Sequence, residues 1–414
     1  MKRLCLLIIM TCMLPSCAAA QWYLFPGKNK AAQTTVKDTA RRAGTDSAKT
    51  AVKPGADSLR VAADTLVPAV PAWADAYVSD IPDVIHIGLA LPIQATGKAS
   101  ENFLDFYSGA LLALRDLGTG GLRADLQVFD TADGKTILMP AQFREKDLFI
   151  GPVPAADVQA VLPRLPEDKV LVSPLDPKTA EMAAEGPVVQ SPSPWTAQID
   201  ELVRWVREDL PVSDEVYVIR DTAAAGQGAQ SAYLMERLQE SRVRYKAVNA
   251  VRDIPFSRGR KARVFIASDR DSFFASAVRS LSIEGALNDD VVLYGTARVR
   301  ANGTGPADLH NTMAHLAVSY FIDYEDPAVR KFILAYRALF QNEPGSFAFQ
   351  GYDTMHYFVN MCSKYGRQWY KKLPEYKQKG LQADFRFTAD HPRVNQAVRR
   401  VIYNKDLTTT CQAD

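Results

Sequence analysis

A regular alternation of short apolar runs and helical segments constrains the fold of this chain more than any other feature. It begins near residue 82. The runs are short, β-branched and apolar, and they span Val84 to Leu91, Leu126 to Asp130, Leu148 to Val153, Val170 to Ser173, Val216 to Arg220, Val264 to Ser268 and Val291 to Tyr294. Apolar strands of this length are typical of parallel sheets that are covered on both faces.

Helical periodicity separates these runs. Apolar residues spaced three and four apart predict helices over 107–117, 195–210 and 329–340. Ser193 and Asp326 stand at the cap positions of the last two, each followed by a proline in the first turn. This alternation predicts an α/β fold with parallel sheets and helices on both faces. Ligands of such sheets bind at the carboxyl ends of the strands, so the loops leaving the strands are candidate binding loops.

The first 20 residues have the features of an export signal peptide. Lys2 and Arg3 precede an apolar run that is shorter than the roughly 20 residues of a membrane-spanning helix. Residues 18–20 suit a signal peptidase that reads small side chains, whereas residues 14–17 resemble a lipoprotein box with Cys17 as the lipidated residue. Both routes stay open. Either one places the mature protein in the periplasm, soluble or anchored through Cys17.

Residues 21–80 are expected to form a low-complexity, disordered spacer. From residue 27 on, the segment is rich in Ala, Thr, Lys, Asp and Pro and has no aromatic residue before Trp73. Such a composition cannot bury enough apolar area to offset the entropy of ordering the chain. A flexible coil of this length has a root-mean-square span of about 40 Å. A spacer of that reach suits a tethered protein.

Composition and motifs argue against several classes of protein. The formal net charge of +2, with 23% charged residues, gives no reason to expect a nucleic-acid partner. The five histidines do not have the spacing of a metal site, and nucleophile-elbow, phosphate-loop and Cys-x-x-Cys motifs do not occur. We therefore expect a protein that is not an enzyme and that uses neither a metal nor a cofactor.

Cysteine use permits one disulfide after export. Cys362 and Cys411 remain once the leader is removed, and an oxidising compartment allows an even pair to bridge. The alternative interpretation is a buried Cys362 on a helix and a free Cys411 near the end of the chain.

A basic and aromatic cluster occupies residues 364–379. Its members are Lys364, Tyr365, Arg367, Trp369, Tyr370, Lys371, Lys372, Tyr376, Lys377 and Lys379. A solvated helix and loop would account for this composition. Contact with a lipid surface or with an anionic cell-wall polymer is the alternative.

Two stretches of the chain resemble the type I periplasmic binding proteins, the group that includes the leucine/isoleucine/valine-binding proteins. The first stretch has a strand, a proline loop, a helix with an internal glycine and a strand ending in aspartate, here Ile87 to Pro92, Thr96-Gly97, Gly109 to Leu114 and Leu126 to Thr131. The second stretch runs from Asp326-Pro327 to Tyr352-Asp353. The resemblance covers roughly residues 82–410. It extends to the related domain of outer-membrane lipoproteins that activate penicillin-binding proteins.

The resemblance implies two Rossmann-like lobes joined by three hinge crossovers, with the ligand held between them. Lobe one would comprise residues 82–192 plus 325–378, and lobe two residues 193–324 plus 379–410. A ligand that touches both lobes stabilises the closed state of such a hinge.

The resemblance also implies a set of ligand-binding residues. In the amino-acid binders of this family, hydroxyl-bearing loops of one lobe hold the ligand carboxylate, and an acidic residue of the other lobe holds its ammonium. The implied contacts are Thr96, Pro154, Ala155, Ser173, Asp176, Gln190, Ser191 and Tyr352 in lobe one, and Asp221, Gln227, Asp269 and Thr296 in lobe two. Asp269 is the candidate ammonium partner. Pro154 departs from the pattern, because it stands where a hydroxyl is expected and has no N–H to donate.

Two functions follow from these expectations. The first is an exported solute-binding protein that captures a small polar ligand, with amino acids among the candidates, for an ABC-type transporter and its permease. The second is a tethered envelope scaffold or activator lipoprotein that binds a cell-wall synthesis protein and has a vestigial cleft. In both, the membrane is contacted only through a lipid anchor on Cys17.

Overall fold

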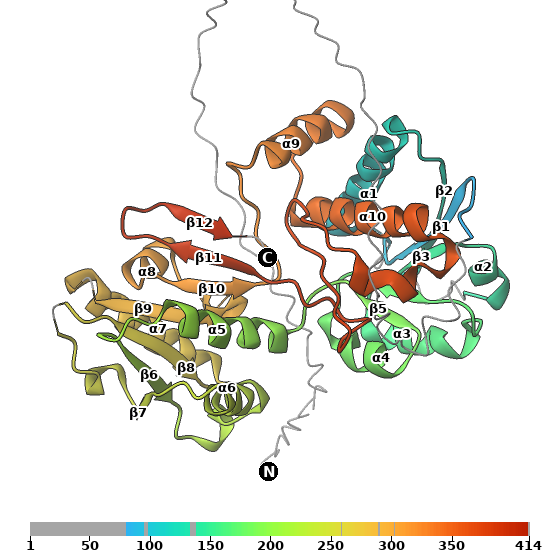
Figure 1. The fold of residues 1–414 in the computed structure, drawn as a ribbon. Helices are drawn as coiled ribbons and strands as arrows, with labels where there is room; N and C mark the ends of the chain where they lie inside the picture. The colour runs from blue at the N-terminus through green and yellow to red at the C-terminus, as the bar shows by residue number, and fades with distance from the viewer. Residues whose placement is uncertain are drawn as a thin grey trace, which may run out of the picture. The chain divides into compact units, whose positions relative to one another are not determined.

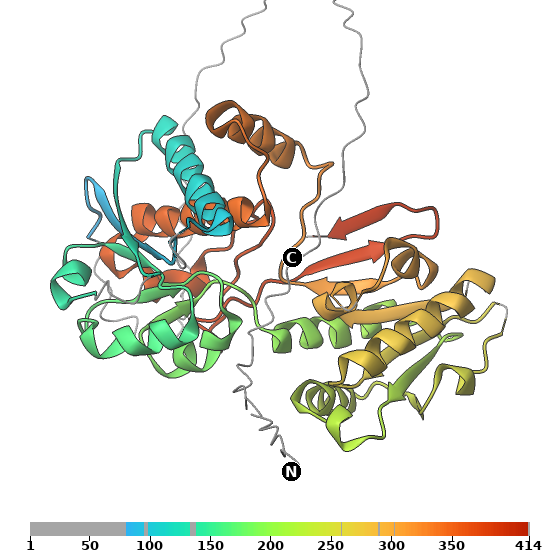
Figure 2. The same ribbon diagram turned by 180° about the vertical axis from the view of Figure 1, so that it is seen from behind.

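The computed structural model describes residues 80–94, 98–132, 138–257, 259–288, 290–301 and 303–412. The predicted signal peptide, Cys17, the spacer up to residue 79 and Thr96 lie outside the described residues. The described residues form two sheets flanked by helices (Figure 1, and from behind in Figure 2). This arrangement confirms the predicted α/β class with parallel sheets.

The first sheet has five parallel strands in the order β2-β1-β3-β4-β5. The strands are β1 (Ile85–Leu91), β2 (Ala124–Asp130), β3 (Leu148–Ile150), β4 (Leu171–Ser173) and β5 (Val188–Gln190). Its helices are α1 (Glu101–Thr119), α2 (Pro140–Arg144), α3 (Ala155–Val161), α4 (Ala180–Glu185), α9 (Pro327–Phe340) and α10 (Ser346–Tyr365), and the short 3-10 turns are η1 (Leu162–Arg164), η2 (Pro177–Thr179) and η6 (Gly366–Glu375). Helices α9 and α10, which come late in the chain, pack on α1.

Alternate residues of the buried strands supply the two faces of this sheet. Ile87 and Leu89 belong to the core that includes α10 residues such as Phe358. Phe149 and Leu171 belong to the core of the opposite face. Both faces are therefore covered by apolar side chains, which is why the runs read as continuously hydrophobic.

The second sheet has seven strands in the order β12-β11-β10-β9-β8-β6-β7. The strands are β6 (Glu215–Arg220), β7 (Lys246–Val248), β8 (Ala262–Ala267), β9 (Val291–Thr296), β10 (His315–Val318), β11 (Arg399–Tyr403) and β12 (Thr409–Gln412). Strands β6 to β10 are parallel, and β11 and β12 add an antiparallel edge that the sequence did not predict. Its helices are α5 (Trp195–Asp209), α6 (Ala229–Glu240), α7 (Asp271–Leu287) and α8 (Pro306–Asn311), and its 3-10 turns are η3 (Ala224–Gly226), η4 (Val251–Asp253) and η5 (Ala297–Arg300).

Helices α5 and α7 cover opposite faces of the second sheet, as Figures 1 and 2 show together. Val264 packs in the core that holds Leu281 of α7. Its neighbour Phe265 packs in the core that holds Trp205 of α5. The period-two alternation of a strand thus divides one apolar run between two cores.

The chain passes between the two sheets three times, through residues 191–194, 319–326 and the segment that ends at β11. The predicted boundaries assign residues 379–410 to lobe two, but the first part of this last passage packs with the first sheet. Phe385 and Phe387 belong to the core of the first sheet, and Val394 forms a parallel bridge with Gln190. Residues 379–395 thus pack with the first sheet, because their aromatic side chains complete its core.

His315 lies at the start of β10 among aromatic rings. Its ring centroid is 4.8 Å from that of Trp205 and 5.1 Å from that of Tyr294, and its Nδ1 donates to the carbonyl of Met313 at 2.8 Å. Burial lowers the pKa of His315 to about 4. The folded state therefore resists the protonation that the unfolded chain accepts near its ordinary value.

Between pH 7 and pH 5 we expect His315 to contribute a fall of about 1–2 kcal/mol in the free energy of unfolding, because only the unfolded chain protonates this residue in that range. Urea denaturation at both pH values measures the change. His315→Gln should flatten this part of the pH dependence. His391→Gln, a change at an exposed histidine, should leave it as in the wild type. Equal pH dependence in all three proteins would contradict the assignment to His315.

Candidate functional site

The candidate site lies in the loops that leave the carboxyl ends of the parallel strands. In the first sheet these loops follow β3, β4 and β5, and in the second sheet they follow β6, β8 and β9. All but one of the described residues in the predicted set lie in these loops or at the adjoining strand ends. Tyr352 is the exception, because it lies inside α10.

In the first sheet, the N-terminus of α3 could bind an anionic group of a ligand, but the carboxylate of Asp176 already occupies it. The backbone amide of Ala155, the first residue of α3, donates to Oδ2 of Asp176 at 2.9 Å. The amide of Lys178 donates to Oδ1 of Asp176 at 3.0 Å. Pro154 stands at the cap position and has no N–H. Asp176, from the loop after β4, therefore closes the terminus of the helix after β3.

The other predicted residues of the first sheet are buried and bond within the protein. Gln190 donates through Nε2 to the carbonyl of Pro192 at 2.8 Å and accepts from Oγ1 of Thr179 at 3.0 Å. The amide of Ser191 donates to the carbonyl of Ser173 at 2.9 Å. The hydroxyl of Ser173 is fully buried, and within the part of the chain that the structure describes it has no hydrogen-bond partner. The side chain of Gln190 and the backbone amide of Ser191 therefore hold these loops in place.

In the second sheet, Asp221 is the most highly connected of the predicted residues. It is 3% exposed and accepts hydrogen bonds from Nε of Arg270 at 2.7 Å, Nη2 of Arg270 at 2.9 Å and Oγ of Ser268 at 2.8 Å. The bond from Arg270 is the main reason that the pKa of Asp221 is lowered to about 2. Asp221 is thus a permanent anion that orients an arginine at the rim of the sheet.

Asp269, the predicted ammonium partner, caps a helix. Its Oδ1 accepts from the amide of Ser231 at 2.8 Å, and its Oδ2 accepts from the amide of Gln230 at 3.2 Å, both in the first turn of α6. Asp269 follows β8, and α6 follows the neighbouring strand β6. The second sheet thus repeats the device of the first, in which an acid after one strand closes the helix after the strand beside it.

The remaining predicted residues divide between the binding loops and other places. Thr296 accepts from the amide of Arg298 and caps η5, and Gln227 is exposed. The hydroxyl of Tyr352 donates to Oδ2 of Asp116 at 3.2 Å, and its ring packs against Phe332. Tyr352 therefore takes part in the packing among α1, α9 and α10.

Sequence reasoning missed two arginines at this edge of the second sheet. Arg270 is 39% exposed and bonded to Asp221. Arg298 donates to Oδ1 of Asp271 at 2.7 Å and to the carbonyl of Ser268 at 2.5 Å. The polar run Ser268-Asp269-Arg270-Asp271 directly after a buried strand was the available signal. It could not show which charges pair.

A small cavity of about 40 Å³ opens beside these loops. It is lined by polar groups of Ser231, Ser268, Thr296 and Arg298 and by apolar side chains that include Phe265 and Leu234. A cavity of this size has room for about three water molecules, since each needs roughly 10–15 Å³. It is a small and mainly apolar recess in the second sheet, with a few polar groups at its edge.

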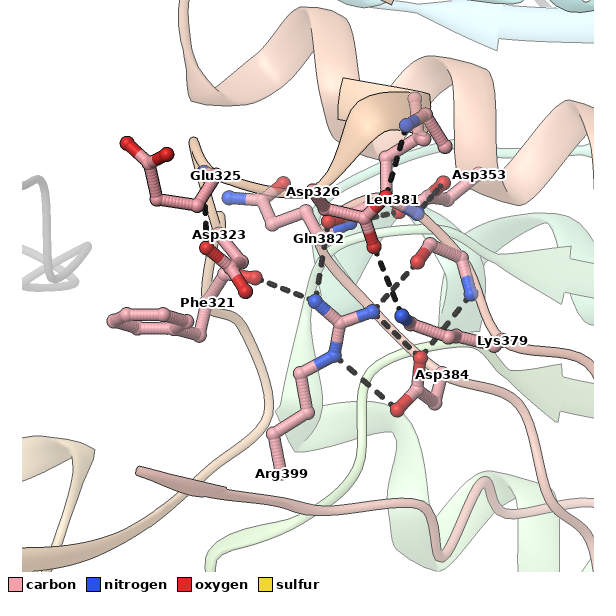
Figure 3. Close-up of polar contacts among 12 residues, drawn as sticks. Phe321, Asp323, Glu325, Asp326, Asp353, Lys379, Leu381, Gln382, Asp384 and Arg399 are labelled. Atoms are coloured by element: carbon pink, nitrogen blue, oxygen red, sulfur yellow. Dashed lines mark hydrogen bonds and ion pairs between the residues drawn. The ribbon is translucent and has the colours of Figure 1, made fainter. Parts of the chain in front are cut away.

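The crossovers between the sheets meet at a buried arginine, which Figure 3 shows at the centre of its contacts. Arg399, at the start of β11, is 2% exposed. Its Nη2 donates to Oδ1 of Asp384 at 2.6 Å and to the carbonyl of Gly380 at 2.6 Å, and its Nη1 donates to the carbonyl of Phe321 at 2.6 Å. Arg399 therefore joins two of the three passages. We call these residues the hinge cluster.

Asp353 of α10 binds the loop 379–384 from the other side. Its carboxylate accepts from the amides of Leu381, Gln382 and Ala383 at 2.7–2.9 Å. Burial raises the pKa of Asp353 to about 6, against the opposing effect of these donors. Nearby, Lys379 donates to Asp326 at 2.9 Å (Figure 3). The loop 379–384 is therefore held by hydrogen bonds from both directions.

The candidate disulfide between Cys362 and Cys411 is not formed, and both cysteines are free. Cys362 is buried in the core of the first sheet, and Cys411 packs against a core of the second sheet from β12. The two thiols are therefore in different cores. Burial raises the pKa of the Cys362 thiol.

Among the described residues, no group of three or more His, Cys, Asp or Glu side chains is placed to hold a metal ion. None of the helices in the same ranges combines the length and apolar character that crossing a membrane requires.

Comparison with known proteins finds similarity at the level of structure. No protein-family model matches the chain, and no curated protein matches it in sequence. A candidate branched-chain amino acid ABC transporter from Rhodospirillum rubrum aligns with a TM-score of 0.53 and 14% identity over 80% of this chain and 100% of that one. An ABC transporter substrate-binding protein from Desulfitobacterium hafniense aligns with a TM-score of 0.49 at 14% identity, again over 80% and 100% of the two chains. The strand alternation, the three crossovers and the first of these alignments agree, and the chain has the α/β fold of the type I periplasmic binding proteins.

Proposed function

We propose that the chain is an exported, non-enzymatic binding protein that captures a small polar ligand by hinge closure and delivers it to an ABC-type permease. The observation that carries the proposal is the pair of sheets whose polar carboxyl-end loops are joined by three crossovers. The half-exposed guanidinium of Arg270, held by Asp221, presents hydrogen-bond donors at the rim of one of these loops. The solved structure from Rhodospirillum rubrum that shares this fold is described as a candidate branched-chain amino acid ABC transporter, which supports a transport role here.

The ligand we propose is held by hydrogen bonds and does not rely on paired charges. A free amino acid needs donors for its carboxylate and an acid for its ammonium. Here the Ala155 amide is already bonded to Asp176, and Asp269 is already bonded to two amides of α6. Displacing either carboxylate would leave a helix terminus unsatisfied. Neutral polar compounds such as sugars and short peptide or cell-wall fragments suit the remaining groups better.

A thermal-shift screen of the full-length protein against amino acids, sugars, short peptides and cell-wall fragments tests this proposal. A ligand at 100 times its dissociation constant adds about 2.7 kcal/mol to the free energy of unfolding. That corresponds to a rise of several degrees in Tm for a domain of this size. We expect at least one neutral polar compound to produce it.

Two arginine variants locate the binding. Arg270→Met should abolish the shift, because it removes the donors at the rim. Arg260→Met makes the same charge change beside Glu215, at the opposite end of β6, and should keep the shift. A shift that survives in Arg270→Met would place the ligand elsewhere.

A second candidate function is the tethered envelope scaffold with a vestigial cleft. Asp176, Asp221 and Asp269, the carboxylates of the predicted site, are already bonded within the protein, and this favours the scaffold. On this account no small molecule raises Tm. A photo-cross-linker placed at Gln227, which is exposed, would instead capture a cell-wall synthesis protein in intact cells.

A further inference from the structure

A hydrogen-bond network at the start of α5 joins the first two passages between the sheets. Ser193 belongs to the first passage, Ser319 belongs to the second, and Gln198 lies in the first turn of α5. The hydroxyl of Ser193 donates to Oγ of Ser319 at 2.8 Å, and the hydroxyl of Ser319 donates back to the carbonyl of Ser193 at 2.9 Å. Nε2 of Gln198 donates to the same Oγ of Ser319 at 3.0 Å. The two passages are therefore bonded to each other and to a helix of the second sheet.

The oxygen of the Gln198 side chain reaches a binding loop. Oε1 of Gln198 accepts from the backbone amide of Ala297 at 3.1 Å. Ala297 is the first residue of η5 and directly follows Thr296, the predicted binding residue that ends β9. The N–H of Ala297 can only donate, so the carboxamide of Gln198 has its oxygen toward the loop and its nitrogen toward Ser319. One side chain thus bridges a binding loop and a passage between the sheets.

A second contact ties η5 to the same passage. Arg300, the last residue of η5, donates through Nη2 to the carbonyl of Tyr320 at 2.9 Å. Its guanidinium also lies over the ring of Phe321, 5.7 Å from the centroid. Phe321 in turn accepts from Arg399 of the hinge cluster. A shift of η5 would break one of these contacts unless the second passage moved with it.

Gln198 lies on the buried side of α5. The residue is 8% exposed, and its neighbours Ala197 and Ile199 belong to an apolar core of the second sheet. Packing alone would be served equally well by an apolar residue at this position. A buried polar side chain that is bonded at both ends fixes the groups around it, because a group that loses its partner there cannot turn to water instead. The carboxamide of Gln198 thus fixes the loop after β9 relative to the second passage.

We propose that Gln198 is a positioning residue that couples the binding loop after β9 to the hinge between the two sheets. The inference rests on the proposed function, because it assigns Gln198 a role within hinge closure. A ligand that draws in Thr296 also moves the amide of Ala297, and Gln198 passes this displacement to the bonded pair Ser193 and Ser319. Coupling of this kind is reciprocal, so closure of the hinge also places the loop for binding.

Distances between two spin labels test the hinge side of this coupling, in the full-length protein and without any added ligand. The labels are spin-labelled unnatural amino acids at Lys331 of α9 and Glu236 of α6, two exposed positions on the two sheets. We expect a broader distribution of distances in Gln198→Leu than in the wild type, because the passages lose a restraint. The matched control is Gln159→Leu, the same change at an exposed position of α3, and it should keep the wild-type distribution.

Hydrogen–deuterium exchange tests the loop side with a milder variant. Ser319→Ala removes the hydroxyl that Gln198 bonds to and leaves Gln198 and Ala297 unchanged. Coupling predicts faster exchange of the amides of residues 297–300 in this variant, although the substitution lies outside that segment. The double variant Gln198→Leu with Ser319→Ala should broaden the distances no more than Gln198→Leu alone, because both changes break one network.

Four results would overturn the proposal. They are a wild-type distance distribution in Gln198→Leu, equal broadening in Gln159→Leu, unchanged exchange of residues 297–300 in Ser319→Ala, and additive broadening in the double variant. A thermal-shift panel without a hit would contradict the proposed function instead. The two failures are distinguishable, because neither the distance measurement nor the exchange measurement uses a ligand.

Discussion

Replacing Arg399 with methionine is expected to lower the free energy of unfolding by about 3–5 kcal/mol, the usual cost of removing one partner from a buried ion pair. The substitution leaves Asp384, which is 6% exposed, as an unpaired buried anion. It also removes the donors to the carbonyls of Phe321, Gly380 and Leu381. Two of the three passages between the sheets lose their common contact. Urea denaturation measures the loss.

Two further arginine variants separate the hinge cluster from general effects of charge. Arg330→Met removes an arginine that is 56% exposed and pairs with an exposed glutamate, so it should cost less than about 1 kcal/mol. Arg399→Lys keeps the charge but loses the planar fork, and it should recover only part of the stability. A similar loss of stability in Arg399→Met and Arg330→Met would show that the hinge cluster contributes no more to the free energy of unfolding than an exposed ion pair does.

A methyl group added at Gly109 is expected to destabilise the protein by about 3 kcal/mol, the upper end of the usual cost of overpacking. A Cβ built there lies 1.8 Å from the carbonyl oxygen of Ala348. The same holds in the other direction for Gly351 of α10. A Cβ built at Gly351 lies 2.0 Å from the carbonyl oxygen of Phe106 in α1. The backbones of α1 and α10 touch at these two points. Backbone atoms cannot turn aside as a side chain can, so the helices must separate.

The control for Gly109→Ala lies on the same helix. A Cβ at Gly118 meets nothing within 4 Å. Gly118→Ala should therefore stabilise the protein by about 0.5–1 kcal/mol, because alanine is the better helix former. Opposite signs for the same substitution two turns apart would establish the contact between α1 and α10. Destabilisation by both substitutions, or by neither, would contradict it.

The strands that the sequence predicted share one property. They are buried along most of their length, as in Ile85 to Leu91 and Val264 to Ala267. A strand that is buried on both faces appears in the sequence as a continuous run of apolar residues. Two of the missed strands, β7 and β12, lack this signal because they are mostly exposed. Strands β5 and β10 are buried and were missed nevertheless, and β11 carries Arg399 where an apolar residue would be expected. Local pattern cannot show that the neighbours of that arginine are carbonyl groups from two other segments.

The candidate site shows the same division between local and distant information. The sequence placed Asp176 and Asp269 in the loops after β4 and β8, where the structure has them. It could not show that each carboxylate reaches the helix after the adjacent strand, because that contact depends on strand order. For Tyr352 the sequence could not show which face of its helix packs against α1, where its hydroxyl bonds to Asp116. The sequence therefore showed which types of side chain lie in the binding loops, but it did not show which groups they bond to.

Hydrogen–deuterium exchange of the full-length protein, with and without the compound that gives the largest thermal shift, tests the central claim most directly. The account predicts slower exchange in residues 173–176 of the first sheet and in 221–227 and 268–271 of the second, because a ligand held by both sheets orders loops from both. Protection confined to one sheet, or no protection with any compound of the panel, would contradict capture between the sheets.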